Sequence, residues 1–341
     1  MSMEETENPD EPPAMPRVVA VINALGMDAV AVALVWMAVF ARATGTKLIA
    51  AEYGVLGVAV WAVYVLDRVM DGGSGALAVR RARHDLAWRW RWWLVPSVLV
   101  AGAAAVWVAL RELRVVVVES GVRLAVAVAA YFLLTLLSRR KGAGNSGPLC
   151  VMGLFAFVLM QGPPEQAPAA QLWRPVLGGF CLAGMYLVLR GKGDRPAAWI
   201  LPRKALGAWL FAFGCALAPH AHIEAWRDLL GGNEVLIFAS VCLLNTLLIR
   251  LVEGGGVGGE ERALARIYPG MALTVAVGGV MQWVHADRWA RPLFAAAAVA
   301  AGLLVLLWVM RRRLPGGLVP LLADAAVLLP GLAVMVAVPG R

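Results

Sequence analysis

Long stretches without a charged side chain recur along the whole chain and are separated by short polar segments. Examples are Trp92–Leu110, Ile267–Val284 and Pro292–Met310, each close to the roughly 20 residues that cross a bilayer as an α-helix. The pattern predicts eleven membrane-spanning helices, centred near Leu34, Val58, Ala101, Val128, Phe155, Ala183, Phe211, Ser240, Val275, Ala300 and Val327.

The composition supports the same fold class. Hydrophobic residues make up 61% of the 341 residues and charged residues 16%, whereas about 25% of a soluble domain is charged. We therefore predict an all-α, polytopic transmembrane helix bundle that forms a single domain over residues 17–341. The first sixteen residues are acidic and rich in proline, so we expect a disordered tail rather than a signal peptide. The four cysteines lie in apolar stretches without metal-ligand spacing, which is typical of small core residues.

The basic residues predict an orientation. With the N-terminal tail in the cytoplasm, twenty-one lysines and arginines fall on the cytoplasmic side and nine on the other. Lys and Arg concentrate on the cytoplasmic side of membrane proteins, so this asymmetry supports both the span count and a cytoplasmic N-terminus. The net charge of +9 is spread over short loops, and we do not expect a nucleic-acid partner.

Several polar side chains lie inside predicted spans, where each is costly unless it faces the bundle interior or water. Glu119 and Arg123 are four residues apart, so we expect them to form an ion pair on one helix. Asp28 and Asp324 have no local partner. Donors on neighbouring helices or a ligand would satisfy them equally well.

The second predicted span ends at two aspartates, Asp67 and Asp71, one helical turn apart. Mg²⁺ is usually held by one or two carboxylates together with phosphate oxygens and water, so this pair could bind a metal–diphosphate. Arg68, Arg80 and Arg83 supply guanidinium groups suited to bidentate contacts with phosphate. By spacing alone, a helix end that balances local arginines is an equally good interpretation.

Asp67-x-x-x-Asp71 with Arg80 and Arg83 resembles the first aspartate-rich motif, NDxxDxxxD, of the UbiA-type intramembrane prenyltransferase superfamily. The two aspartates match the second and third acids of that motif. Its Asn and first Asp are replaced here by Val63 and Tyr64, so one metal-facing carboxylate is absent.

A second stretch, residues 247–255, resembles the DxxKDxEGD motif of the same superfamily. Arg250 stands for its basic residue and Glu253 for one acid, while Leu247, Leu251 and Gly255 occupy aspartate positions. Asn245, upstream of this stretch, could add a polar ligand or could simply pack between helices. The second metal site is therefore depleted.

Further segments resemble a divergent bacterial branch of the superfamily: Trp61–Arg68, Pro202–Lys204 with Leu210–Gly214, and Leu322–Pro330. The resemblance implies a nine-helix bundle with both motif loops cytoplasmic, in a bacterial inner membrane. Eleven spans are compatible with it if residues 148–190 form an inserted helical hairpin, because adding a pair of spans preserves the sidedness of the later loop.

The resemblance implies a prenyltransferase. Mg²⁺ on Asp67 and Asp71, with Arg68, Arg80, Arg83 and Lys204, would bind an isoprenyl diphosphate, and an aromatic or other lipophilic acceptor would capture the isoprenyl group. Tyr64 would orient the acceptor or stabilise the allylic cation, unless it is a packing aromatic. The alternative is a non-catalytic bundle of the same fold that binds a lipid, a quinone-like molecule or a protein partner.

Overall fold

The structure is a computed structural model that describes residues 25–73, 88–138, 200–223, 232–253, 259–315 and 318–337. These ranges contain nine α-helices and no β-strand. The helices are α2 (Met27–Thr44), α3 (Ala50–Gly73), α5 (Arg91–Glu112), α6 (Val115–Ser138), α10 (Ile200–His222), α12 (Asn233–Glu253), α13 (Gly259–His285), α14 (Arg291–Met310) and α15 (Leu318–Ala337). The predicted all-α fold is confirmed for this part of the chain.

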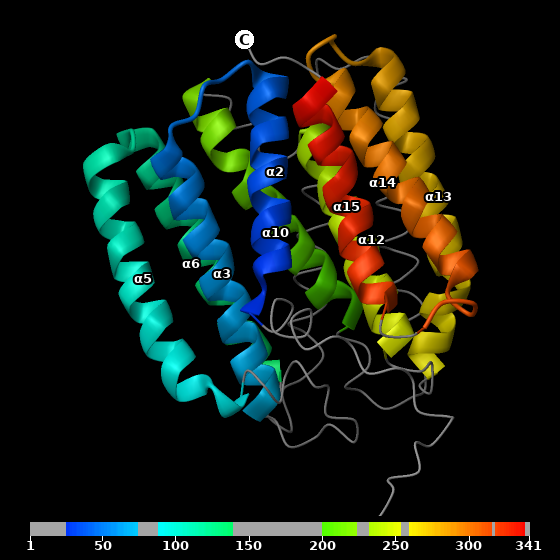
Figure 1. Cartoon of the computed structure of the whole chain (residues 1–341), viewed down its shortest axis with the longest axis horizontal. Coiled ribbons are helices and arrows are strands. Elements are labelled where there is room, and N and C mark those ends of the chain that lie inside the picture. The colour runs from blue at the N-terminus through cyan, green and yellow to red at the C-terminus, as the bar shows by residue number, and fades with distance from the viewer. Residues whose placement is uncertain are drawn as a thin grey trace, which may run out of the picture.

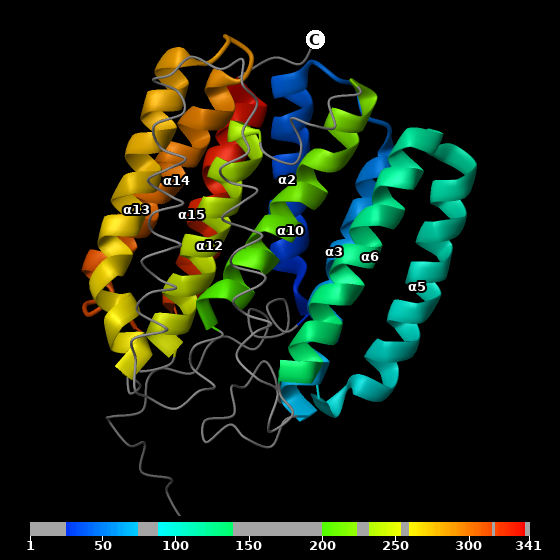
Figure 2. The same cartoon turned by 180° about the vertical axis from the view of Figure 1, so that it is seen from behind.

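Helices that follow one another along the chain run in opposite directions and pack side by side, as Figures 1 and 2 show. Among the described helices, the last, α15, packs on the first, α2, which closes the series into a ring. Across the middle of this ring, α10 packs against α2 and α12 packs against α15. We call the end at which α3 and α12 terminate the motif end, and the other the opposite end.

A glycine terminates α2 at the opposite end. Gly45 adopts a left-handed conformation with φ of 68°, and its N–H donates to the carbonyl of Arg42. The next N–H, of Thr46, donates to the carbonyl of Ala41 at 2.8 Å. This pair of hydrogen bonds satisfies carbonyls that the helix end leaves free, and glycine adopts the required conformation without a steric penalty. The chain then turns within a few residues into α3.

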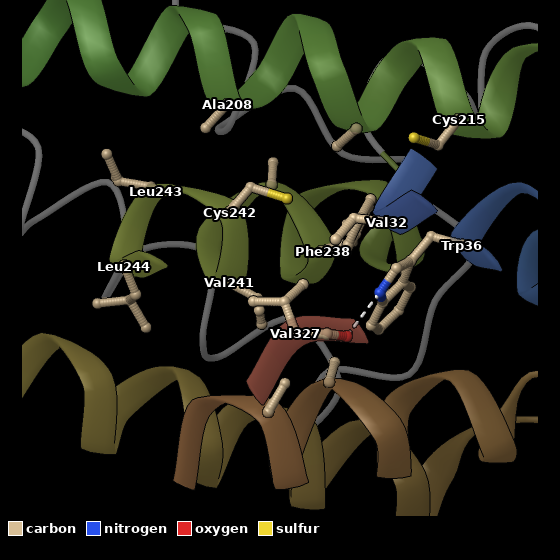
Figure 3. Packing of buried hydrophobic residues seen from close by; sticks show 14 of the residues in the cluster. Val32, Trp36, Ala208, Cys215, Phe238, Val241, Cys242, Leu243, Leu244 and Val327 are labelled. Atoms are coloured by element: carbon tan, nitrogen blue, oxygen red, sulfur yellow. Dashed lines mark hydrogen bonds between the residues drawn. The ribbon is translucent and has the colours of Figure 1, made fainter. Parts of the chain in front are cut away.

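The centre of the bundle is apolar and tightly packed, as Figure 3 shows. Trp36 of α2 stacks on Phe238 of α12, with ring centroids 4.1 Å apart. Its indole N–H donates to the carbonyl of Val327 on α15 at 3.0 Å. One buried tryptophan thus joins three helices, and it satisfies its only polar group in doing so.

The outer surface of the bundle is also apolar. Helix α5 buries Leu94 and Val98 against α3, while Trp92, Trp93 and Trp107 on the same helix are exposed. A soluble protein rarely exposes so much apolar surface, whereas a helix that faces lipid is expected to expose apolar side chains. Seven of the described helices are long and apolar enough to cross a membrane, which identifies an integral membrane protein.

Nine of the eleven predicted span centres fall within the nine described helices. The spans predicted near Phe155 and Ala183, with the hairpin assigned to residues 148–190, lie outside the described residues, as does the predicted tail over residues 1–16. Cys215 and Cys242 are buried free thiols, as expected of core residues. The total number of spans and the orientation in the membrane stay predictions.

Candidate functional site

The aspartate pair lies where the sequence predicts, at the end of a membrane helix. Helix α3 ends at Gly73, two residues after Asp71. Asp67 is partly exposed, whereas Arg68 is only 7% exposed and its guanidinium carbon lies 5.9 Å from the centroid of the Tyr64 ring. The side chain of Asp71, together with Arg80 and Arg83, lies outside the described residues. The described half of the first motif is therefore Tyr64, Asp67 and Arg68.

Tyr64 packs against the start of α2. Gly26, just before that helix, has φ of 71°, and a β-carbon added to it would lie 3.0 Å from the β-carbon of Tyr64. Such an approach is tighter than most contacts of a β-carbon, and the positive φ disfavours other residues, so both space and conformation favour glycine here. The close contact brings the first turn of α2, which carries Asp28, next to the tyrosine.

The Tyr64 hydroxyl lies in a charged environment drawn from three helices. The charged side chains within electrostatic range of it are Asp28 on α2, Arg68 on α3 and Asp324 on α15. The ring edge meets Phe211 of α10 at a centroid distance of 6.3 Å. The tyrosine thus contacts Phe211 through its ring and lies within electrostatic range of two aspartates and an arginine.

Asn245 and Asp324 bring the second motif region to the same end of the bundle. The side-chain amide of Asn245 on α12 donates to Oδ1 of Asp324 on α15 at 2.8 Å. The Oδ1 atoms of Asn245 and Asp28 are both buried and accept no hydrogen bond within the described structure. Because buried acceptors are costly to leave without donors, this region can accommodate a hydrogen-bond donor.

The other residues of the second motif are arranged differently. Leu247 and Leu251, which occupy aspartate positions of the superfamily motif, are buried in the apolar core. Nη2 of Arg250 lies 3.5 Å from Oε1 of Glu261 on α13, so its charge is already paired. Glu253 is partly exposed at the last position of α12. This stretch therefore packs in the core and forms an ion pair between α12 and α13.

Lys204 lies in the first turns of α10, at the motif end of the bundle, and is partly buried. One turn further along, a β-carbon added to Gly207 would lie 3.4 Å from the hydroxyl of Tyr131 on α6. These contacts place a lysine and a second tyrosine hydroxyl at the end of the bundle that carries Asp67.

Within the described residues, no three His, Cys, Asp or Glu side chains gather closely enough to hold a metal ion. Two carboxylates one turn apart on α3 remain as hard oxygen donors of the type that Mg²⁺ prefers. A magnesium ion on this pair would take its other ligands from water and from phosphate oxygens. The magnesium site at Asp67 and Asp71 stays a prediction, because the side chain of Asp71 lies outside the described residues.

The proximity of Asp28 and Asp324 to Tyr64, and the hydrogen bond from Asn245 to Asp324, were not predicted from the sequence. The signal available was the isolation of each polar residue in an otherwise apolar stretch. Comparison of the chain with protein-family models, curated proteins and solved structures gave no match.

Proposed function

We propose that the chain is a UbiA-like intramembrane prenyltransferase that binds an isoprenyl diphosphate at the motif end. The observation that supports this most is the grouping of carboxylates, an amide and a tyrosine beside the end of α3 that carries Asp67 and Asp71. An amphiphile with an anionic headgroup and an apolar tail suits a polar site at the end of an apolar bundle. The same proposal includes a location in a bacterial inner membrane, with the N-terminus and both motif loops in the cytoplasm.

In this proposal Asp67 and Asp71 would hold Mg²⁺, which neutralises the diphosphate as it departs. Arg68 and Lys204, with Arg80 and Arg83, would bind the phosphate oxygens. The surrounding apolar side chains exclude water, which strengthens these charged contacts and protects an allylic cation from hydrolysis.

The transfer itself exchanges two bonds. The allylic C–O bond of the donor breaks and its electron pair leaves with the diphosphate, while the nucleophilic atom of the acceptor bonds to the allylic carbon. The acceptor then loses a proton, for which the Oδ1 atom of Asp28 is an available base. The π face of Tyr64 would stabilise positive charge on the allylic carbon.

One observation favours a non-catalytic alternative, in which the bundle binds a lipid, a quinone-like molecule or a protein partner without transferring a group. Leu247 and Leu251 are buried in the core, and Arg250 is paired with Glu261. These contacts give the second motif stretch a packing role.

A binding and turnover assay separates the two functions. Purified protein in lipid nanodiscs is mixed with isoprenyl diphosphates of several chain lengths, with Mg²⁺ or with EDTA, and both bound ligand and released diphosphate are measured. We expect metal-dependent binding followed by diphosphate release once a suitable acceptor is present. Binding without release across a panel of aromatic acceptors would favour the non-catalytic protein.

Asp67→Asn tests the site directly. The variant should weaken metal-dependent binding at least tenfold, because the amide replaces an anionic magnesium ligand. Asp287→Asn is the matched control, since Asp287 is exposed in the turn between α13 and α14 at the opposite end. If no donor binds to the wild-type protein, or if Asp67→Asn binds as tightly as wild type, the proposed site is wrong.

A further inference from the structure

A second polar group lies at the opposite end of the bundle and plays no part in the proposed transfer. It consists of Glu52 at the start of α3, His222 at the end of α10, and Arg114 immediately before α6. Nε2 of His222 lies 2.6 Å from Oε1 of Glu52, and a guanidinium nitrogen of Arg114 lies 3.2 Å from Nδ1 of His222. The three side chains form one hydrogen-bonded chain, which we call the Glu–His–Arg chain.

Glu52 is the fixed member of this chain. Its side chain is only 2% exposed, and its second oxygen, Oε2, accepts the backbone N–H of Ile49 at 2.9 Å. Ile49 is the residue just before α3, so Glu52 caps the first turn of its own helix in the manner of a capping box. A carboxylate held by its own helix and by a histidine cannot move without uncapping α3.

The partners of His222 define its protonation state. A carboxylate oxygen only accepts hydrogen bonds and a guanidinium group only donates them. With an ionised Glu52, the two contacts fit a neutral imidazole that donates from Nε2 to Glu52 and accepts at Nδ1 from Arg114. A proton on Nδ1 would point at an N–H group of Arg114, whose nitrogen is only 3.2 Å away. It would also bring a positively charged imidazole next to the positively charged guanidinium group.

Arg114 depends on this acceptor. It lies at the N-terminal end of α6, where the helix dipole disfavours a positive charge. Its carbonyl accepts the N–H groups of Val117 and Val118 at 2.9 and 3.1 Å, so the first turn of α6 is built on this residue. Because Leu113 and Arg114 form the whole connection from α5 to α6, the contact with His222 ties this hairpin to α10.

We propose that His222 is a pH-dependent latch. Neutral His222 joins Glu52 to Arg114, whereas protonated His222 keeps Glu52 and releases Arg114 with the first turn of α6. Acid therefore loosens the α5–α6 hairpin from α10 at the end of the bundle opposite the candidate site. This inference does not depend on the proposed enzymatic function.

Other ionisable groups lie near the Glu–His–Arg chain at this end of the bundle. On the helices packed against α10 they are Arg42 of α2, Tyr53 of α3, Glu119 of α6 and Glu234 of α12, and α10 itself carries His220. His220 is a separate case, because its Nδ1 lies 2.8 Å from the carbonyl of Ala216 within the same helix and its ring packs near Phe40. Of the two histidines, only His222 joins groups from two other helices.

Hydrogen exchange of the α6 first turn tests the latch. Protection factors of the Val117 and Val118 amides are measured in nanodiscs at about pH 8 and about pH 5, the range over which histidine side chains commonly change charge. After correction for the intrinsic exchange rate, we expect protection to fall about tenfold at the lower pH, the factor that corresponds to losing one hydrogen bond. Unchanged protection in the wild-type protein would overturn the proposal.

Three variants separate a latch from a structural contact. His222→Gln can still donate to Glu52 and accept from Arg114 but does not titrate, so protection should stay high at both pH values. Arg114→Ala should give low protection at both. His285→Gln, at the exposed end of α13, is the matched control and should keep the wild-type pH response.

Nitrogen NMR of the imidazole rings supplies a direct readout. The His222 signal is the one that disappears in His222→Gln, and it should report a proton on Nε2 at the higher pH. A proton on Nδ1, or a His222→Gln protein that retains the pH response, would refute the latch.

Discussion

Asn245→Ala should destabilise the bundle by an amount that reports the charge on Asp324. The substitution removes the amide that donates to Oδ1 of Asp324 at 2.8 Å and leaves the carboxylate among α12, α15 and α2. Neutral hydrogen bonds between membrane helices are worth about 0.6 kcal/mol, whereas hydrogen bonds to charged groups are worth about 1.5–3 kcal/mol. For an ionised Asp324 we expect the free energy of unfolding to fall by about 2 kcal/mol.

A double-mutant cycle makes this reasoning testable. Asp324→Asn keeps an oxygen that accepts from Asn245 but carries no charge, so it should cost less than about 1 kcal/mol. In the double variant, Asn245→Ala should become cheaper, because Asp324→Asn has already removed the charge that the Asn245 amide stabilises. Unfolding free energies are measured by steric trapping in bicelles, where the protein stays in a lipid environment.

Two results would contradict the argument. A cost for Asn245→Ala near 0.6 kcal/mol would mean a neutral hydrogen bond and a protonated Asp324. Equal costs for Asn245→Ala in the wild-type and Asp324→Asn backgrounds would mean that the two side chains are not coupled at all. The first outcome would also remove Asp324 as a source of negative charge beside Tyr64.

Two further predictions concern helix packing. Gly279→Ala should destabilise the protein by about 1–3 kcal/mol, because the added β-carbon would lie 2.9 Å from the β-carbon of Ala298 and 3.1 Å from its backbone; Gly270→Ala on the same helix, with open space around the added carbon, is the control and should be neutral or mildly stabilising. Trp36→Phe should cost about 1–3 kcal/mol, since it removes the hydrogen bond to Val327 and part of the ring stacked on Phe238; an unfolding free energy equal to wild type would contradict the joining role of Trp36.

The long uncharged stretches predicted the described helices well because a membrane span must be apolar whatever it packs against. They predicted the helix ends less well. The uncharged stretch Ile267–Val284 lies inside the longer helix α13, Gly259–His285. The additional turns carry Glu261, whose ion pair with Arg250 lies at the motif end of α12 and α13. Polar extensions of this kind depend on a neighbouring helix, which the local sequence does not identify.

The ion pair of Glu119 and Arg123 shows the same limit. The pair forms as predicted, with 3.7 Å between Nη2 and Oε2. Both side chains point outward, however, with 61% and 67% of their surfaces exposed, whereas intramembrane charges were expected to face the bundle interior or water. Spacing of four residues brings two side chains together on one helix, but the direction of that face depends on how the helix packs.

The candidate site combines both kinds of information. The spacing of Asp67 and Asp71 can be recognised within one helix, whereas the bond from Asn245 to Asp324 joins residues 79 positions apart on helices that are not consecutive. A single sequence contains no measure of the rotation of one helix against another. For this reason the acids and arginines of the first motif were predicted, and the contacts around Tyr64 were not.

The positions of Tyr64, Asp67 and Asp71 along α3 indicate in which direction a bound isoprenyl diphosphate would extend. A helix rises 1.5 Å per residue, so Tyr64 lies about 10 Å deeper in the bundle than Asp71 and about 5 Å deeper than Asp67. A diphosphate held by the two aspartates would therefore direct its first carbons toward Tyr64 and the buried oxygens of Asp28 and Asn245. The charged headgroup and the reacting carbon would occupy successive levels of one helix. This ordering is the reason to connect the aspartate pair and the deeper polar group in one proposal.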